Sequence, residues 1–319
     1  MRVFLFPGQG SQFVGMGIDA YRESGTIRDI FDRANDVLGY RLTEVMFDGP
    51  EENLRATQNA QPALFLHAYA LYQTVENPGP AMMAGHSLGE YTALAVAGAL
   101  RFDDALTLVR LRAEAMAEAG QMQVGTMGAV IGLNDDAIRE VCERVSRGGD
   151  LVVPANFNSE GQVVISGTPE GVRKAMAEAK EAGARMVTEL SVSGAFHSPL
   201  MKPAEEKLAE ALSDAPIRDA EVPVYMNVSA QPVTDATTIR DGLLRQLTAP
   251  VLWTQTIKGM IADGGREFIE VGPGNVLQKL VGRISRDVAV SGLGKLEQIN
   301  TFNHNSENNA ESAGEENKA

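Results

Sequence analysis

The sequence predicts an α/β fold in which a large domain is interrupted by a smaller inserted one. A Gly-x-Ser-x-Gly stretch at residues 85–89 lies between a short apolar segment and an alanine-rich one, the order strand, turn, helix. Residues 126–190 show strand and helix patterns in the order βαββαβ, and the α/β pattern resumes near Val192. These observations predict an α/β-hydrolase-like large domain that carries a ferredoxin-like subdomain.

The periodicity of apolar residues predicts each element in chain order. In the large domain we expect strands at residues 3–6 and 81–84 and helices at 27–38, 62–75, 90–100 and 103–120. In the insertion we expect strands at residues 126–133, 151–156, 162–166 and 185–190 and helices at 135–146 and 169–182.

The predicted domain division follows from these patterns. Residues 1–123 and 192–292 form the large domain, and residues 124–191 form the subdomain. Residues 293–319 are acidic and rich in Asn, with almost nothing to bury after Glu297, so we expect a disordered tail.

Composition excludes several classes of protein. A net charge of −14 argues against binding to nucleic acid and to anionic membranes. No apolar run approaches a membrane span, and the first residues do not form a signal peptide. A single cysteine, Cys142, cannot form an internal disulfide, which favours a reducing, cytoplasmic compartment.

Ser87, at the centre of the Gly-x-Ser-x-Gly stretch, is the candidate nucleophile. A sharp turn between strand and helix lifts the serine hydroxyl clear of the sheet, and glycines on both sides leave room for that turn. The N–H groups at the start of the following helix can stabilise an oxyanion. The alternative is an ordinary helix cap flanked by glycines.

His197 is the candidate base, by elimination among four histidines. His67 lies in an apolar helix, His86 in the turn itself and His304 in the tail. His197 lies in a loop bounded by Gly and Pro downstream of Ser87, in the nucleophile-then-base order of α/β hydrolases. The alternative is a capping or loop histidine.

No acidic residue completes a catalytic triad in the sequence around His197. A pair of serine and histidine suffices more readily when the leaving group is a thiol, because a thiol pKa of about 8.5 makes departure easier than for an amine. The missing acid therefore points to thioester chemistry.

Arg112 falls on the apolar face of the helix predicted at residues 103–120. A buried guanidinium requires a carboxylate partner. That partner is either a buried Asp or Glu from elsewhere in the chain or the carboxylate of a substrate held beside Ser87. Each charge-assisted hydrogen bond contributes about 1.5–3 kcal/mol, enough to select a carboxylated acyl group.

These motifs together resemble those of malonyl-CoA:acyl-carrier-protein transacylases, from residue 1 to about 292. They are Phe6-Pro7-Gly8-Gln9-Gly10-Ser11-Gln12, Gly85-His86-Ser87-Leu88-Gly89-Glu90, Arg112, Asn156-Phe157-Asn158, Gly194-Ala195-Phe196-His197-Ser198, Gln246 before Pro250-Val251, and Glu270-Val271-Gly272-Pro273-Gly274.

The resemblance implies a role for each matching residue. It makes Ser87 the acylated nucleophile, His197 the base and Arg112 the group that binds the malonyl carboxylate. It implies further that the N–H groups of Gln9 and Leu88 form the oxyanion hole, that the Gln246 carbonyl orients His197, and that Met116, Asn156 and Phe196 line or support the pocket, Phe196 by crowding out an α-methyl branch.

The resemblance also implies partners: malonyl-CoA and a holo-acyl carrier protein as substrates, no metal or redox cofactor, and a monomer. A local cluster of Lys and Arg near the pocket mouth is expected to receive the carrier protein. Two alternatives remain at this point. One is a trans-acting acyltransferase of a polyketide assembly line, and the other is an acyl-thioester hydrolase, against which Arg112 and the missing acid argue.

Overall fold

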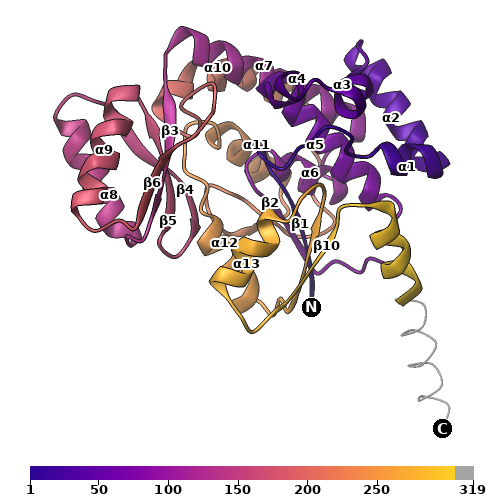
Figure 1. The fold of residues 1–319 in the computed structure, drawn as a ribbon. Coiled ribbons are helices and arrows are strands. Elements are labelled where there is room, and N and C mark those ends of the chain that lie inside the picture. The colour runs from indigo at the N-terminus through magenta and orange to yellow at the C-terminus, as the bar shows by residue number, and fades with distance from the viewer. Residues whose placement is uncertain (306–319) are drawn as a thin grey trace.

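The computed structural model describes residues 1–305, arranged as a large unit and a smaller one beside it (Figure 1). The first part of the large unit contains β1 (Arg2–Phe6), α1 (Ile18–Glu23), α2 (Gly25–Leu38), α3 (Leu42–Asp48), α4 (Glu51–Arg55), α5 (Thr57–Tyr72), β2 (Met82–Gly85), α6 (Gly89–Val96) and α7 (Phe102–Met122). The smaller unit contains β3 (Thr126–Ile131), α8 (Asp135–Arg147), β4 (Val152–Ser159), β5 (Gln162–Gly167), α9 (Pro169–Glu181) and β6 (Met186–Glu189).

The chain then returns to the large unit. This second part contains a 3-10 turn (Pro199–Met201), α10 (Lys202–Asp214), β7 (Val224–Tyr225), β8 (Pro232–Val233), α11 (Ala236–Arg245), α12 (Trp253–Ala262), β9 (Glu267–Val271), α13 (Val276–Ile284) and β10 (Ala289–Leu293). None of the helices described here combines the length with the apolar character that crossing a bilayer would need.

The large unit is built on a six-stranded sheet with the strand order β10-β9-β1-β2-β7-β8. All neighbouring pairs are parallel except β7 and β8. In the register between β1 and β2, Phe6 lies opposite Gly85, so the two strands end side by side. The loop after β1 and the turn after β2 therefore meet at the carboxyl edge of the sheet, where open α/β sheets bind ligands.

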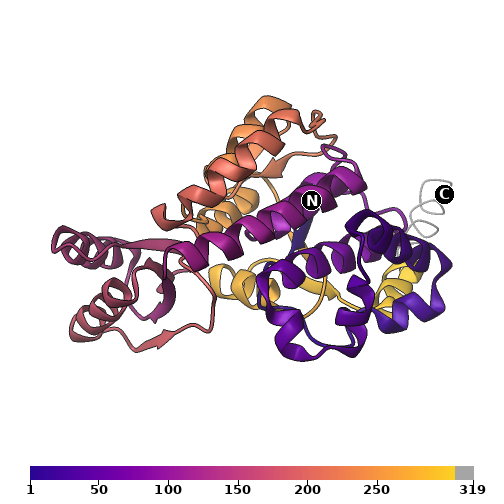
Figure 2. The same ribbon diagram turned by 90° about the horizontal axis from the view of Figure 1, so that it is seen from above.

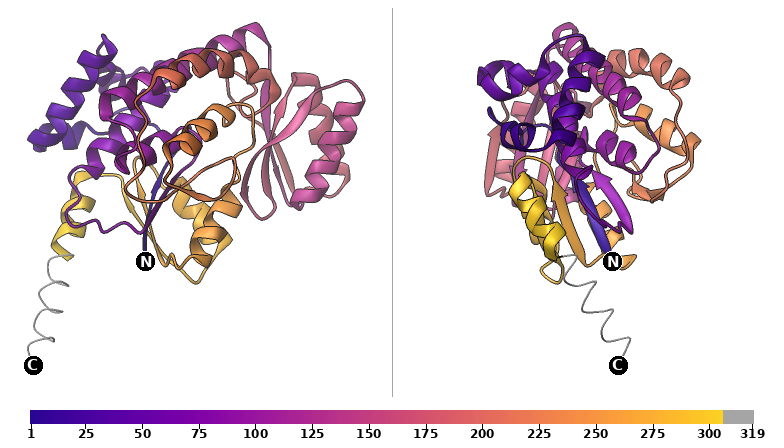
Figure 3. Two further views of the ribbon diagram at one scale, coloured as in Figure 1. Left: turned by 180° about the vertical axis from the view of Figure 1, so that it is seen from behind. Right: turned by 90° about the vertical axis from the view of Figure 1, so that its right-hand side faces the viewer.

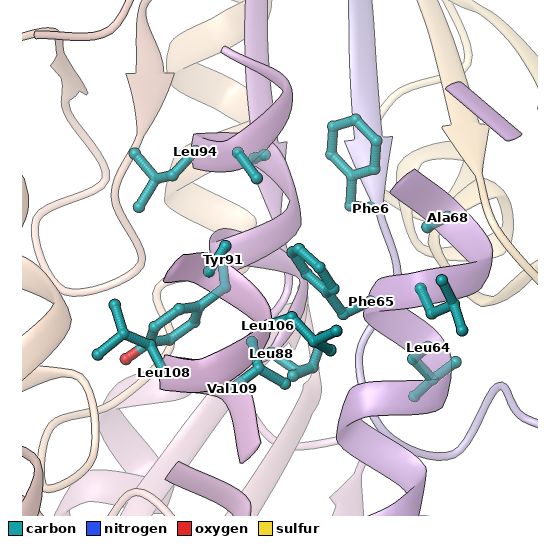
Figure 4. Packing of buried hydrophobic residues seen from close by; sticks show 14 of the residues in the cluster. Phe6, Leu64, Phe65, Ala68, Leu88, Tyr91, Leu94, Leu106, Leu108 and Val109 are labelled. Atoms are coloured by element: carbon teal, nitrogen blue, oxygen red, sulfur yellow. The ribbon is translucent and has the colours of Figure 1, made fainter. Parts of the chain in front are cut away.

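Both faces of this sheet are buried, and alternate residues of β1 serve the two cores. Phe4 and Phe6 pack under α5, α6 and α7 in the larger core, part of which is drawn in Figure 4. Val3 and Leu5 pack with α12 and α13 on the other face. Seen from above, the long helix α7 runs across the molecule toward the smaller unit (Figure 2).

The smaller unit has a four-stranded antiparallel sheet with the order β4-β5-β3-β6, against which α8 and α9 pack. This βαββαβ arrangement is the ferredoxin-like fold predicted for the insertion. Two backbone hydrogen bonds join it to the large unit: Phe157 N–H donates to Val251 O, and Val251 N–H donates to Ala155 O, both at 2.9 Å. The predicted fold class is confirmed, and the left view in Figure 3 shows the two units side by side.

Two of the expected helices have bounds that differ from the structure by more than two residues. The helix expected at residues 62–75 begins earlier, at Thr57, and includes Pro62. The helix expected at residues 90–100 ends at Val96, because Gly98 takes the left-handed conformation with φ of 78° and terminates it.

The prediction of disorder from residue 293 onward is wrong for residues 293–305. Residues 296–305 are helical, and Leu296 and Ile299 are buried. Phe302 packs under the Arg2 guanidinium. Leu296, Ile299 and Phe302 are spaced three residues apart and so share one helix face. The many polar residues of the segment hide this pattern in the sequence. Residues 306–319 of the predicted tail lie outside the described residues.

Candidate active site

Ser87 lies in a tight turn between β2 and α6, with a φ of 51°. A Cβ on Gly89 would lie 2.1 Å from the Phe6 carbonyl oxygen, and one on Gly85 would lie 1.9 Å from the Gly89 backbone. Only glycine fits at either position. The Asn227 side chain fastens the turn, because its Oδ1 accepts the Ser87 N–H and its Nδ2 donates to the Gly85 carbonyl, each at 2.7 Å.

The structure brings Ser87 and His197 together. Nε2 of His197 lies 2.8 Å from Ser87 Oγ, and Nδ1 lies 2.8 Å from the main-chain carbonyl oxygen of Gln246. A carbonyl oxygen only accepts, so Nδ1 carries the proton and Nε2 is free to accept one from the serine. Burial, with the nearby Arg112 charge, lowers the pKa of His197 to about 3, which keeps the imidazole neutral.

Arg112 points from α7 to the same place and is fully buried. Its Nη2 donates to Ser87 Oγ at 3.0 Å and to the Gln246 side-chain oxygen at 2.8 Å, and its Nη1 donates to Gln61 Oε1 at 2.6 Å. Within residues 1–305 Arg112 forms no ion pair with a carboxylate, and its Nε has no hydrogen-bond partner. The sequence predicts a carboxylate in direct contact with Arg112. No Asp or Glu of the described chain provides that contact.

Two residues that line the pocket beside Ser87 have main-chain N–H groups without acceptors in the described chain. Among residues 1–305, neither the Gln9 N–H, in the loop after β1, nor the Leu88 N–H, at the start of α6, forms a hydrogen bond. Unpaired N–H groups at a helix start attract negative charge. The arrangement suits the stabilisation of an oxyanion beside Ser87.

These groups open onto a cavity of about 450 Å³ that lies between the two units. All of the site residues predicted from the sequence except Gln246 line it: Gln9, Ser87, Leu88, Arg112, Met116, Asn156, Phe196 and His197. Gln246 is buried directly behind them. Asn158 contributes from β4, and its Oδ1 lies 2.8 Å from Nε2 of the neighbouring His86.

Sequence reasoning missed three polar residues of this site. Gln61 accepts from Arg112, Asn227 fastens the serine turn, and Glu90 accepts hydrogen bonds from Asn227 and Gln246. Gln61 could have been found as a polar residue within the apolar stretch of α5. Glu90 could have been found as an acidic residue in the alanine-rich helix α6. The only signal for Asn227 in the sequence is its position just after a short buried strand.

The assembled groups suit one kind of chemistry. A serine hydroxyl beside a neutral histidine, two free N–H groups and a buried cation are the parts needed to form an acyl-serine and stabilise its tetrahedral intermediate. The fold and the site thus define a serine-dependent acyltransferase or hydrolase.

Comparison with known proteins resolves the class. The chain belongs to the acyl transferase domain family, whose model matches residues 3–315. It is 47% identical over 285 residues to the malonyl CoA-acyl carrier protein transacylase of Bacillus subtilis, with 89% of this chain and 90% of that protein covered. It is 40% identical over 301 residues to the enzyme of that name from Staphylococcus aureus, with 94% and 98% covered.

Solved structures agree with these sequence relatives. A malonyl CoA-acyl carrier protein transacylase from Coxiella burnetii superposes with a TM-score of 0.91 at 41% identity, covering 94% of this chain and 96% of that one. A malonyl-transacylase solved in complex with a type II polyketide acyl carrier protein superposes with a TM-score of 0.90 at 39% identity, covering 95% and 99%.

Proposed function

We propose that this chain transfers the malonyl group from malonyl-CoA to the phosphopantetheine thiol of an acyl carrier protein, through an acyl-enzyme on Ser87. One observation carries the proposal: Ser87 Oγ lies 2.8 Å from the neutral imidazole of His197 and 3.0 Å from the Arg112 guanidinium. Nucleophile, base and carboxylate-binding cation thus meet at one atom. The names of the relatives identify malonyl-CoA and the carrier protein as the substrates.

In the first half-reaction Ser87 Oγ attacks the thioester carbonyl while His197 Nε2 takes its proton. The Gln246 carbonyl holds the imidazole in the required tautomer through Nδ1. The N–H groups of Gln9 and Leu88 stabilise the oxyanion. When the tetrahedral intermediate collapses, the carbon–sulphur bond breaks and His197 returns its proton to the departing CoA thiolate.

Arg112 selects the acyl group. A guanidinium binds a carboxylate through two parallel hydrogen bonds, and the buried site excludes water that would weaken them. The malonyl carboxylate thus provides the direct partner that Arg112 lacks in the described chain. Because the carboxylate is held, the reacting carbonyl is kept in place over Ser87. Phe196, which lines the cavity, is proposed to crowd out a branch on the α-carbon.

In the second half-reaction the carrier protein's thiol enters the emptied cavity. His197 removes its proton, the thiolate attacks the serine ester, and Ser87 leaves with the proton returned from His197. Both half-reactions exchange a thioester and an ester, so neither requires an oxidant or a reductant. We place the protein in the cytoplasm, where fatty-acid elongation would consume the product.

Mass spectrometry of the intact protein after brief incubation with malonyl-CoA tests this proposal. We expect one malonyl adduct on Ser87 that clears when a holo-acyl carrier protein is added. Ser87→Ala should abolish the adduct, and His197→Ala should slow its formation by about a hundredfold or more. An adduct that clears in buffer alone, with release of free malonate, would instead identify a thioester hydrolase.

A polyketide carrier protein is the second candidate acceptor. It is favoured by the structure at 39% identity in which a type II polyketide acyl carrier protein is bound to its malonyl-transacylase. The discharge rates of the malonyl-enzyme with a fatty-acid carrier and a polyketide carrier separate the two. Faster discharge by the fatty-acid carrier supports the first assignment.

A further inference from the structure

Glu90 is a buried carboxyl group that the steps above leave without a role. It lies in the first turn of α6, three residues after Ser87, and none of its surface is exposed. Its Oε2 accepts the Asn227 main-chain N–H, and its Oε1 accepts a hydrogen bond from the Gln246 side-chain Nε2 at 2.9 Å. Burial raises the pKa of Glu90 to about 8, against the lowering effect of the hydrogen bonds from Asn227 and Gln246 and of the Arg112 charge. Both oxygens act as hydrogen-bond acceptors, and this arrangement favours the ionised carboxylate.

Glu90 determines which way the Gln246 side-chain amide points. In the observed orientation the NH2 group donates to Glu90 and to the Ser87 carbonyl oxygen at 3.0 Å, and the amide oxygen accepts from Arg112 at 2.8 Å. In the flipped orientation the NH2 group would face a guanidinium, which only donates, and the amide oxygen would face two other oxygens. The two acceptor oxygens of Glu90 favour the observed orientation over the flipped one.

Glu90 also interacts with the Arg112 guanidinium through space, without a direct contact between the two. Burial lowers the pKa of Arg112, while attraction to Tyr91 and Glu90 raises it. The Gln246 amide separates the two charges, so Glu90 does not occupy the guanidinium as a direct ion pair would. Nε of Arg112 has no hydrogen-bond partner in the described chain.

We infer that Glu90 is a positioning residue that orients the Gln246 amide and thereby holds the Arg112 guanidinium where a substrate carboxylate binds. This inference rests on the proposed function, because the property that Glu90 sets is preference for a carboxylated acyl group. Glu90 itself touches neither the substrate nor Ser87 Oγ. Its removal therefore acts on selectivity through Arg112.

Glu90→Gln tests the inference, because glutamine keeps the size of the side chain but offers only one acceptor. One of the two hydrogen bonds then becomes a contact between donors, and the Gln246 amide loses its fixed orientation. The kcat/KM values for acylation by malonyl-CoA and by acetyl-CoA are measured for the wild type and the variant. We expect the malonyl-to-acetyl ratio to fall at least tenfold, chiefly through a higher KM for malonyl-CoA.

Leu94→Ala is the control for loss of stability. Leu94 is a buried residue on the same helix that packs in the hydrophobic core near Tyr91 (Figure 4). This variant should lower Tm and leave the acyl preference unchanged. Glu90→Gln could behave in the same way, with a smaller folded fraction but an unchanged malonyl-to-acetyl ratio of kcat/KM. Glu90 would then contribute only to stability, and the inference would be wrong.

Gln246→Met keeps the inference testable even where Glu90→Gln does not fold. It removes the amide between Glu90 and Arg112 while leaving the main-chain carbonyl for His197. We expect the same fall in the ratio, and no further fall when both substitutions are combined. Additive losses, or an unchanged ratio in Gln246→Met, would overturn the inference. A wild type that forms no malonyl adduct would overturn the proposed function and this inference with it.

Discussion

Ser87 and His197, whose side chains are 2.8 Å apart, both have left-handed backbones, with φ of 51° and 56°. This conformation costs a non-glycine residue about 1–2 kcal/mol and persists only where the surroundings enforce it. At Ser87 the close approach of Gly89 to β1 and the Asn227 bridge provide that enforcement. Both partners of this one hydrogen bond thus have a strained backbone. In this conformation Ser87 Oγ and His197 Nε2 point at each other.

Arg112→Ala should remove the preference for malonyl-CoA. Two charge-assisted hydrogen bonds to the substrate carboxylate are lost, each worth about 1.5–3 kcal/mol, so kcat/KM for malonyl-CoA should fall at least about 100-fold. Acylation by acetyl-CoA, which has no such carboxylate, should change far less. Arg112→Lys is the control, because it keeps the charge but not the geometry of two parallel hydrogen bonds. Its kcat/KM for malonyl-CoA should lie between that of the wild type and that of Arg112→Ala. Equal losses for both acyl groups would contradict the assignment.

Gly89→Ala should prevent the native fold from forming. Its Cβ would lie 2.1 Å from the Phe6 carbonyl oxygen, a backbone atom of a central strand that cannot move aside cheaply. We expect little or no soluble folded protein, measured by expression and circular dichroism. Gly282→Ala on α13 is the matched control, because nothing lies within 4 Å of that Cβ. Its better helix propensity should stabilise the protein by about 0.5–1 kcal/mol. Similar behaviour of the two variants would refute the packing argument.

The elements found correctly from the sequence are those with a strong local pattern. The strand, turn and helix around Ser87 and the βαββαβ order of the insertion each leave a mark within a few residues. His197 was reached by elimination, which worked because the chain has only four histidines.

The site residues that were not predicted make contacts between parts of the chain that are distant in sequence. Gln61 and Arg112 are 51 positions apart, and Asn227 and Ser87 are 140 apart, so no local pattern joins them. Within the described chain Arg112 donates to the amide oxygens of Gln61 and Gln246 and not to an Asp or Glu, an arrangement that only tertiary packing reveals. The helix at residues 296–305 was missed because three buried or packed residues sit among many polar ones.

Glu270→Ala should loosen the pocket mouth. The Glu270 carboxylate is buried and accepts the N–H groups of Leu277 and Gln278, each at 3.1 Å, which caps the start of α13. Its loss leaves two unpaired N–H groups, at a cost of about 1–3 kcal/mol in the free energy of unfolding. Because α13 contributes to the cavity wall, KM for the acyl-CoA should rise more than kcat falls.

Glu267→Ala, on the same strand, is the control for Glu270→Ala. Its side chain is half-exposed and pairs with Arg2 at the surface, so the substitution should cost about 0–1 kcal/mol and leave KM unchanged. Urea unfolding and steady-state kinetics measure both quantities. If the two variants prove equally mild, α13 does not depend on its cap.

Acid should destabilise the protein through its buried histidines. Burial lowers the pKa of His67 to about 4 from 6.5, so the folded state keeps this group neutral while the unfolded chain protonates near 6.5. The stabilisation is fully present above pH 6.5 and is lost as the pH falls toward 4, by on the order of 3 kcal/mol. His197, whose pKa is lowered to about 3, acts with the same sign.

His67→Leu isolates the first of these two contributions. His67 lies in α5, and its Nδ1 has no hydrogen-bond partner among the described residues, so leucine removes a buried polar atom without breaking a bond. Urea unfolding at pH 7 and pH 4.5 should show a smaller loss of stability in the variant than in the wild type. The part that remains in the variant includes His197. Identical losses in the two proteins would mean that His67 is already protonated, or already solvated, in the folded state.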